Sequence, residues 1–362
     1  MKKLWVLIFL TSFCSAIYAK DKLIFALDLI RHGDRSPIKN IPTINYKWPN
    51  GLGQLTPIGM HQEYLLGQRF RKIYVDTYHL LPSRFDIKSI YVRSTDYDRT
   101  LMSAQSLLTG LYPRGTGPNL PGSSLPTLPN AIQPIPIHTI PKDLDDLLIA
   151  EHNVTEFNAA EEKYIYPSLA WKKKTSEVSS DFARWQAATG VKINTLDDVI
   201  SVGNTLYIDR LHHAPLPSTL TEAEVSKIIA VGKWAFVQEY MSPEIGKITS
   251  TLLLKTIMEY LKAAATKKDS LKYVLFSAHD TTSLGLASVL QSPLQEAPPY
   301  ASDFNFSLFK NSTGHYFVNI TFNGKALPIP ACNHTNTCSL AQLEVLTKQK
   351  NLNTQTDRHR GL

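Results

Sequence analysis

The feature that most constrains the fold is an apolar run that ends abruptly in a polar, glycine-containing turn. Residues 23–30 are apolar except for Asp28, and the chain continues directly into Arg31-His32-Gly33-Asp34-Arg35-Ser36-Pro37. A nearly continuous apolar run of this length is typical of a buried strand in a parallel sheet. Open α/β folds bind ligands at the carboxyl edge of such a sheet, so we expect this turn to line a crevice.

Two further runs predict strands that end in the same kind of residue. Residues 87–92 lead into Arg93, and residues 272–278 lead into His279 and Asp280. Three predicted strands in a parallel-sheet pattern therefore deliver basic or acidic side chains to one edge. We expect a helix to begin after the third strand, with Thr281 or Thr282 as its cap, because apolar residues follow at helical spacing.

The residue types at these strand ends suit a phosphate group. Arginine guanidinium groups form bidentate bonds to phosphate oxygens, and a neutral imidazole is a nucleophile that can carry a phosphoryl group. The alternative interpretation of the first turn is an exposed loop with an incidental basic cluster, since short motifs have false matches.

Several motifs make the chain resemble the histidine acid phosphatases, the second branch of the histidine phosphatase (phosphoglycerate mutase-like) superfamily. The resemblance covers about residues 22–340 and is weakest between about 145 and 250. The His279-Asp280-Thr281-Thr282 motif is similar to that of the prostatic and lysosomal type, whereas phytases of the family usually end this motif in asparagine. Sparse cysteines favour a bacterial member. The motifs that carry the resemblance are residues 31–37, 48–56, 91–96, 99–104, 133–139, 277–282 and 298–302.

The resemblance implies a fold and a set of roles. The fold would be α/β, a three-layer α/β/α sandwich with an inserted helical cap domain. His32 would be the nucleophile that becomes phosphorylated, and Asp280 would donate a proton to the leaving group. Phosphate would be held by Arg31, Arg35, Arg93 and His279, with no metal and no cofactor.

This resemblance predicts an acid phosphatase that hydrolyses small phosphate monoesters. A narrower phytase or lysophosphatidate phosphatase would use the same residues, and a catalytically inactive phosphate-binding protein would need only the arginines. The presence of both His32 and Asp280 argues against the last alternative.

The chain begins with features of an export signal. Lys2 and Lys3 precede an apolar stretch at residues 4–13, which is too short to span a membrane, and residues 17–19 offer a cleavage site. We therefore expect residues 1–19 to be a signal peptide and the mature protein to be secreted or periplasmic, with no membrane anchor. The formal net charge of +7 comes without a basic tail or a nucleic-acid motif, which argues against nucleic-acid binding. The sequence leaves a homodimer open.

Once Cys14 is removed with the signal peptide, the chain keeps Cys332 and Cys338. Two cysteines flanking a short polar loop in an exported protein favour a disulfide. A zinc site with His334 is the alternative, but two thiols and one imidazole form an incomplete ligand set.

The domain prediction divides the chain into a core of residues 20–141 and 251–362 and a helical cap of residues 142–250. Residues 113–141 are rich in proline and should run over the surface in extended form. Leu253, Ile257 and Leu261 predict a helix that returns to the core, and residues 304–309 and 315–322 predict two terminal strands.

Three other polar sites receive structural interpretations. We expect His138 to be a structural histidine in a packed loop, and His212 and His213 to lie in the cap or in a surface loop rather than to bind a metal. Asp34 is expected to orient the neighbouring arginines, because a second negative charge would oppose phosphate.

Overall fold

The computed structural model describes residues 21–266 and 270–348, so the predicted signal peptide lies outside the described residues. The core is a mixed sheet in the strand order β2-β3-β1-β4-β5-β6, with β7 pairing with β5. The strands β1, β2 and β3 are parallel, and β4 pairs with β1 in the antiparallel sense. The strands predicted near residues 23, 87, 272, 304 and 315 are confirmed. Their bounds are β1 Lys22–Arg31, β2 Ile90–Ser94, β3 Tyr273–Ala278, β4 Asp303–Lys310, β5 Tyr316–Phe322, β6 Lys325–Ala326 and β7 Thr337–Cys338.

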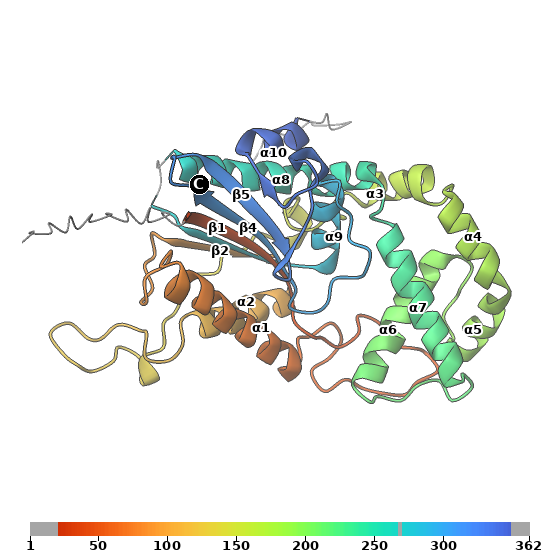
Figure 1. The fold of residues 1–362 in the computed structure, drawn as a ribbon. Helices are drawn as coiled ribbons and strands as arrows, with labels where there is room; N and C mark the ends of the chain where they lie inside the picture. The colour runs from red at the N-terminus through yellow and green to blue at the C-terminus, as the bar shows by residue number, and fades with distance from the viewer. Residues whose placement is uncertain (1–20, 267–269, 349–362) are drawn as a thin grey trace, which may run out of the picture.

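Helices cover both faces of the sheet, which confirms the three-layer α/β/α prediction (Figure 1). One face packs against α1 (Pro57–Phe70) and α2 (Asp98–Leu111), and the other against α8 (Pro243–Ala265), α9 (Asp280–Val289) and α10 (Leu340–Thr347). Strand β1 supplies both cores, because Ala26 and Ile30 join the first and Leu27 and Leu29 join the second. This two-sided burial is the reason that the strand is apolar at nearly every position.

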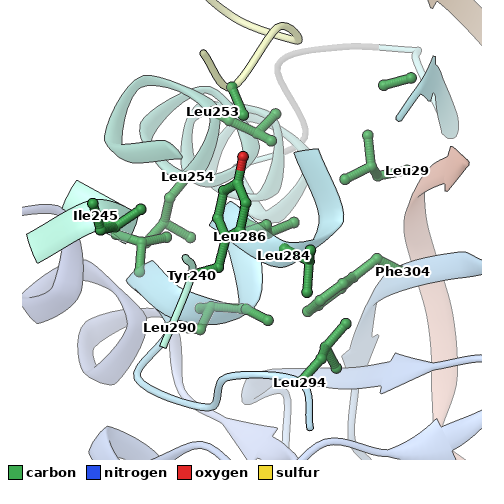
Figure 2. Close-up of a cluster of buried hydrophobic side chains, with 14 of the residues drawn as sticks. Leu29, Tyr240, Ile245, Leu253, Leu254, Leu284, Leu286, Leu290, Leu294 and Phe304 are labelled. Carbon is green, nitrogen blue, oxygen red and sulfur yellow. The ribbon is translucent and has the colours of Figure 1, made fainter. Parts of the chain in front are cut away.

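The second core is shown in Figure 2, where leucines of α8 and α9 pack with Phe304 of β4. The first turn of α9 differs from the sequence prediction. The helix begins at Asp280 with His279 as its N-cap, and Thr282 contributes to the cap from the first turn, where its hydroxyl accepts from the His279 amide at 3.3 Å. The Thr282 hydroxyl also donates to the carbonyl of Leu148 at 2.7 Å.

A group of helices lies beside the sheet at the right of Figure 1. These helices are α3 Val154–Ala160, α4 Leu169–Val178, α5 Phe182–Thr189, α6 Leu196–Leu211 and α7 Glu222–Gln238. Helices α6 and α7 cross at Gly203 and Gly232, where a Cβ atom on either residue would lie within 3 Å of a backbone carbonyl oxygen of the other helix. The domain boundary predicted at residue 250 falls inside α8, which begins at Pro243 and packs on α9 as one continuous helix.

Short helical turns connect these elements. They are η1 Arg71–Thr77, η2 Pro129–Ala131, η3 Lys142–Leu144, η4 Glu161–Ile165, η5 Ser179–Asp181 and η6 Pro330–Cys332. The proline-rich segment between α2 and η3 forms isolated bridges but no named strand, as predicted, and one bridge pairs His138 with Arg93. Among the residues described, no helix is long and apolar enough to cross a membrane.

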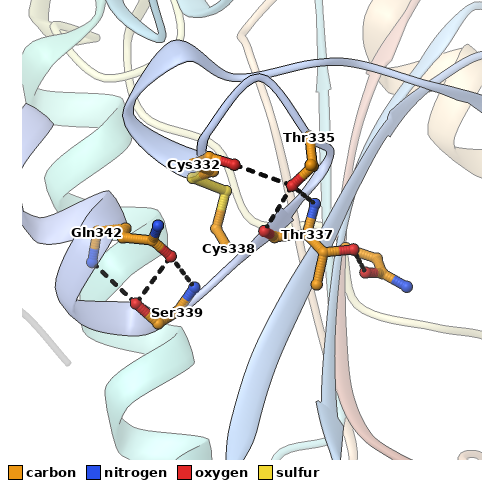
Figure 3. Close-up of a disulfide and its surroundings, with 7 residues drawn as sticks. Cys332, Thr335, Thr337, Cys338, Ser339 and Gln342 are labelled. Carbon is orange, nitrogen blue, oxygen red and sulfur yellow. Dashed lines mark hydrogen bonds between the residues drawn. A yellow bond between two sulfur atoms is a disulfide. The ribbon is translucent and has the colours of Figure 1, made fainter.

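The structure contains the predicted disulfide between Cys332 and Cys338 (Figure 3). Cys338 belongs to β7 and pairs with Val318 of β5, and the Thr335 hydroxyl donates to the Cys332 carbonyl at 2.9 Å. The disulfide thus closes a polar loop onto the edge of the sheet.

Candidate active site

The loop that follows β1 is fixed tightly against α1. A Cβ atom on Gly33 would lie 2.4 Å from the carbonyl oxygen of Gly59, so only glycine permits this approach. The Gly33 amide donates to the Ser103 hydroxyl at 3.1 Å, and the Asp34 amide donates to Gln62 at 2.9 Å. The side chains that leave this loop are therefore held in place before a ligand arrives.

His32 is buried at the end of β1, with 2% of its surface exposed. Its Nδ1 lies 2.8 Å from the Gly33 carbonyl oxygen, which can only accept, so Nδ1 carries the proton and Nε2 keeps its lone pair. Burial and the charges of Arg31, Arg99 and Arg35 lower the pKa of His32 well below its usual value. The imidazole is therefore neutral and nucleophilic in mildly acidic solution.

Arg31, Arg35 and Arg99 supply the positive charge around His32. Arg31 lies with its Cζ 4.2 Å from the ring centre of Tyr300 and donates to the Pro298 carbonyl. The Nε atoms of Arg31, Arg35 and Arg99 are all buried without a hydrogen-bond partner. Burial and the charge of Arg35 lower the pKa of Arg99 to about 10. Unpartnered guanidinium donors crowded together are the expected state of a site built for an anion.

Arg93, the third arginine predicted to hold phosphate, pairs with a buried carboxylate and keeps its Nε buried without a hydrogen-bond partner. Arg93 lies within β2, opposite Phe276, and its Nη2 contacts Asp145 Oδ1 at 2.5 Å. Asp145 is fully buried and also accepts from the Leu148 amide at 3.0 Å. Arg93 therefore neutralises a buried carboxylate and stabilises the segment that contacts Thr282.

His279 faces His32 from the N-cap of α9, with the two ring centres 5.7 Å apart. Its Nε2 lies 3.0 Å from the Thr95 hydroxyl, and its ring packs edge-on against Tyr97. Burial and the charge of Arg99 lower the pKa of His279 to about 3. His279 is thus a second neutral imidazole at the site.

Asp280 begins α9 and pairs with Arg31, with Oδ2 2.7 Å from Nη2. Burial alone would raise the pKa of this carboxyl, but the charges of Arg31 and Arg35 outweigh burial, and the net effect lowers the pKa. Without a bound phosphate the carboxyl is therefore ionised. A phosphate dianion would offset the two guanidinium charges, which favours uptake of a proton by Asp280.

The sequence interpretation overlooked Arg99, Tyr300 and Glu151. Arg99 and Tyr300 lie in stretches that carry the family resemblance, and Arg99 lies in the first turn of α2, beyond the end of β2. No local sequence pattern indicates that Glu151 belongs to the site. It accepts a hydrogen bond from Tyr240, and burial and the charge of Asp280 raise its pKa.

The remaining polar predictions have mixed outcomes. His138 stacks on Tyr91 at 5.0 Å, which agrees with a structural role. His213 is exposed, whereas the Nε2 of His212 lies 2.8 Å from Asp34 Oδ2. Asp34 accepts from the Thr56 hydroxyl at 2.5 Å, and no contact between its carboxylate and an arginine is found among the described residues. It does not orient the arginines directly.

The geometry combines a free imidazole nitrogen, an excess of guanidinium donors and a carboxyl that can gain a proton. Phosphoryl transfer requires mainly such positioning and charge neutralisation. In the described part of the chain, the one carboxylate group with metal-like spacing is Glu161, Asp197 and Glu239, which is separate from His32.

Comparisons with known proteins agree with this geometry. The family model for the histidine phosphatase superfamily (branch 2) matches residues 22–323. Lysosomal acid phosphatase of Xenopus laevis is 34% identical over 90% of this chain and 76% of its own length. Prostatic acid phosphatase of Bos taurus is 33% identical over 94% and 88% of the two chains.

A solved structure of Hafnia alvei phytase with myo-inositol hexakis sulphate has the same fold, with a TM-score of 0.67 and 17% identity. The alignment covers 91% of this chain and 97% of the phytase. On the family match and the two acid phosphatase relatives, the chain belongs to branch 2 of the histidine phosphatase superfamily, the histidine acid phosphatases.

Proposed function

We propose that this protein is an acid phosphatase that hydrolyses small phosphate monoesters through a phosphohistidine on His32. The observation that carries the proposal is the state of His32: a buried, neutral imidazole with Nδ1 held by Gly33 and with three arginines around it. Binding alone would need the arginines but not a free Nε2.

In the first step, His32 Nε2 attacks phosphorus while the bond from phosphorus to the ester oxygen breaks. Asp280 donates its proton to that oxygen, so the product leaves as a neutral alcohol or phenol. Arg31, Arg35, Arg93 and Arg99, with His279, stabilise the charge on the phosphoryl oxygens. In the second step, a water oxygen attacks phosphorus while the bond from phosphorus to His32 Nε2 breaks. Asp280 accepts a proton from the water, and inorganic phosphate leaves the regenerated imidazole.

Substrate size would be set by the helices between residues 142 and 242 and by the loop around Trp48. The names of the two relatives support a general acid phosphatase, and Thr282 distinguishes the chain from the usual phytase motif. An export route to the periplasm or outside the cell is supported by the N-terminal sequence and by the disulfide.

The test is a rapid-quench experiment on His32→Ala with labelled p-nitrophenyl phosphate, using an alkaline denaturing quench because phosphohistidine is stable in alkali. We expect turnover to fall by several powers of ten and labelled enzyme to disappear. The exposed His213→Asn variant is the matched control and should behave like the wild type, because asparagine tolerates the φ of 55° at this position. Full labelling of His32→Ala would refute the phosphohistidine mechanism.

A further inference from the structure

The catalytic loop of the core touches a histidine from the helical cap. His212 lies at the carboxyl end of α6, and its Nε2 is 2.8 Å from Oδ2 of Asp34, the residue between Gly33 and Arg35. The Asp34 side chain is fully buried and that of His212 is 14% exposed. The two atoms are close enough to interact electrostatically, but the contact lacks hydrogen-bond geometry.

Asp34 has few other groups that could compensate its charge. Oδ2 accepts from the neutral hydroxyl of Thr56 at 2.5 Å, while Oδ1 is buried without a hydrogen-bond partner. A buried carboxylate that loses one partner is costly and seeks another cation. The nearest cations in sequence are Arg35 and Arg31, the arginines that the proposed phosphate site uses.

The His212 ring also packs against an aromatic residue of the core. Trp48 packs edge-on against it with ring centres 5.2 Å apart and planes at 83°, and Tyr46 packs edge-on against Trp48 at 5.5 Å. The Trp48 loop belongs to the core segment between β1 and α1. The ring is thus held between two core groups, one aromatic and one acidic.

We propose that His212 is a positioning residue for the catalytic loop, and this inference rests on the proposed phosphatase function. By pairing with Asp34, the cap residue keeps that carboxylate away from Arg31 and Arg35, so both guanidinium groups stay available to phosphate. The cap then contributes to turnover and phosphate affinity as well as to substrate size.

The test compares His212→Phe with the wild type. Phenylalanine keeps a ring against Trp48 and removes the nitrogen that faces Asp34. We expect kcat/KM for p-nitrophenyl phosphate to fall about tenfold and the inhibition constant of inorganic phosphate to rise by a similar factor, the range of one interaction with a charged group. A residue with only a structural role would change the Tm and leave both constants of the folded enzyme unchanged. His213→Asn is the matched control, since asparagine tolerates the φ of 55° at this position.

A double-mutant cycle with Asp34→Asn isolates the pair. If His212 acts through Asp34, the double variant is no worse than the worse single variant. If phenylalanine prevents folding, His212→Leu takes its place in the same cycle. The proposal would be overturned if the effects of His212→Phe and Asp34→Asn on kcat/KM multiplied in the double variant. It would also be overturned if His212→Phe kept the wild-type kcat/KM and inhibition constant. If the wild-type enzyme shows no turnover, or forms no phosphoenzyme, the proposed function on which this inference rests would be refuted instead.

Discussion

Two clusters of ionisable side chains in this protein differ in the charge of their neighbours. The phosphate pocket places His32 and His279 among three arginines. The second cluster, here called the carboxyl cluster, consists of Glu151, Glu161, Asp197 and Glu239. The arginines of the pocket are not among the main causes of the pKa shifts of its three glutamates. The clusters meet where the charge of Asp280 acts on Glu151.

Burial favours the neutral form in both clusters, but the pKa values move in opposite directions. In the pocket, burial and the charge of Arg99 lower the pKa of His279 to about 3. In the carboxyl cluster, burial and the charge of Asp197 raise the pKa of Glu161 to about 7, and burial with the charge of Glu161 raises that of Glu239 well above its usual value. The pocket thus offers positive charge to an anion, whereas in the carboxyl cluster the surroundings favour the protonated form of the three glutamates.

The largest effect is expected where the clusters meet. Asp280→Asn cannot donate a proton, so cleavage of an alkyl phosphate such as glycerol phosphate should slow by roughly three to four powers of ten. An activated ester, p-nitrophenyl phosphate, leaves as a weak base and should be affected much less. Steady-state rates of one variant on both esters decide the point. Equal losses would assign Asp280 to phosphate binding and leave the proton donor unidentified.

The second prediction compares Arg93 in β2 with Arg99 in the first turn of α2. Arg99→Gln should lower kcat by about a hundredfold and weaken inhibition by phosphate, because it removes a donor to the transferring group. Arg93→Gln should weaken phosphate inhibition less and should also lower the Tm, because it leaves the buried Asp145 carboxylate without its cation. Inhibition constants and melting curves for both variants test this, and unchanged phosphate inhibition in Arg93→Gln would remove Arg93 from the phosphate site.

The third prediction concerns stability and pH. Because the pKa of Glu161 is raised in the folded state, its contribution to stability is complete below about pH 4.5 and is lost as the pH rises through about 7. Glu161→Gln should therefore raise the Tm at pH 8 by a few degrees, on the order of 3 °C, with little change at pH 5. The neighbouring exposed Glu162→Gln is the control. A gain of the same size at both pH values would show that the effect is not protonation.

His279 should have the opposite dependence. Its lowered pKa gives a contribution that is complete above about pH 6.5 and is lost as the pH falls through about 3. His279→Asn should then flatten the acid limb of the Tm profile and leave the alkaline limb unchanged. Loss of the alkaline limb in this variant would mean that the two clusters do not titrate independently.

The smallest expected effect is that of a chelator. Because the arginines neutralise the transferring phosphate, dialysis against EDTA should leave kcat unchanged, whereas vanadate should inhibit by occupying the guanidinium groups. Activity that is lost on dialysis and restored by a divalent ion would contradict this and would direct attention to the carboxyl cluster.

Much of the core and part of the site could be predicted from local patterns. An apolar run that ends in a polar turn predicts a strand from neighbouring residues alone, so the strand ends at His32 and His279 could be predicted. The disulfide was predictable because its two cysteines are close in sequence. The start of α9 was predicted too late in the chain. Threonine is a preferred N-cap residue, but here His279 is the N-cap and Asp280 begins the first turn.

The sequence by itself determined the alternation of strands and helices and the chemistry at the strand ends, because both depend on residues a few positions apart. The tertiary structure decided which charges meet. Arg93 and Arg99 lie in neighbouring motifs, yet Arg93 contacts Asp145 whereas the charge of Arg99 acts on His32. The contact of His212 with Asp34 and the carboxyl cluster depend on how distant helices pack. Side-chain pairing across a fold follows from that packing, which no local pattern records.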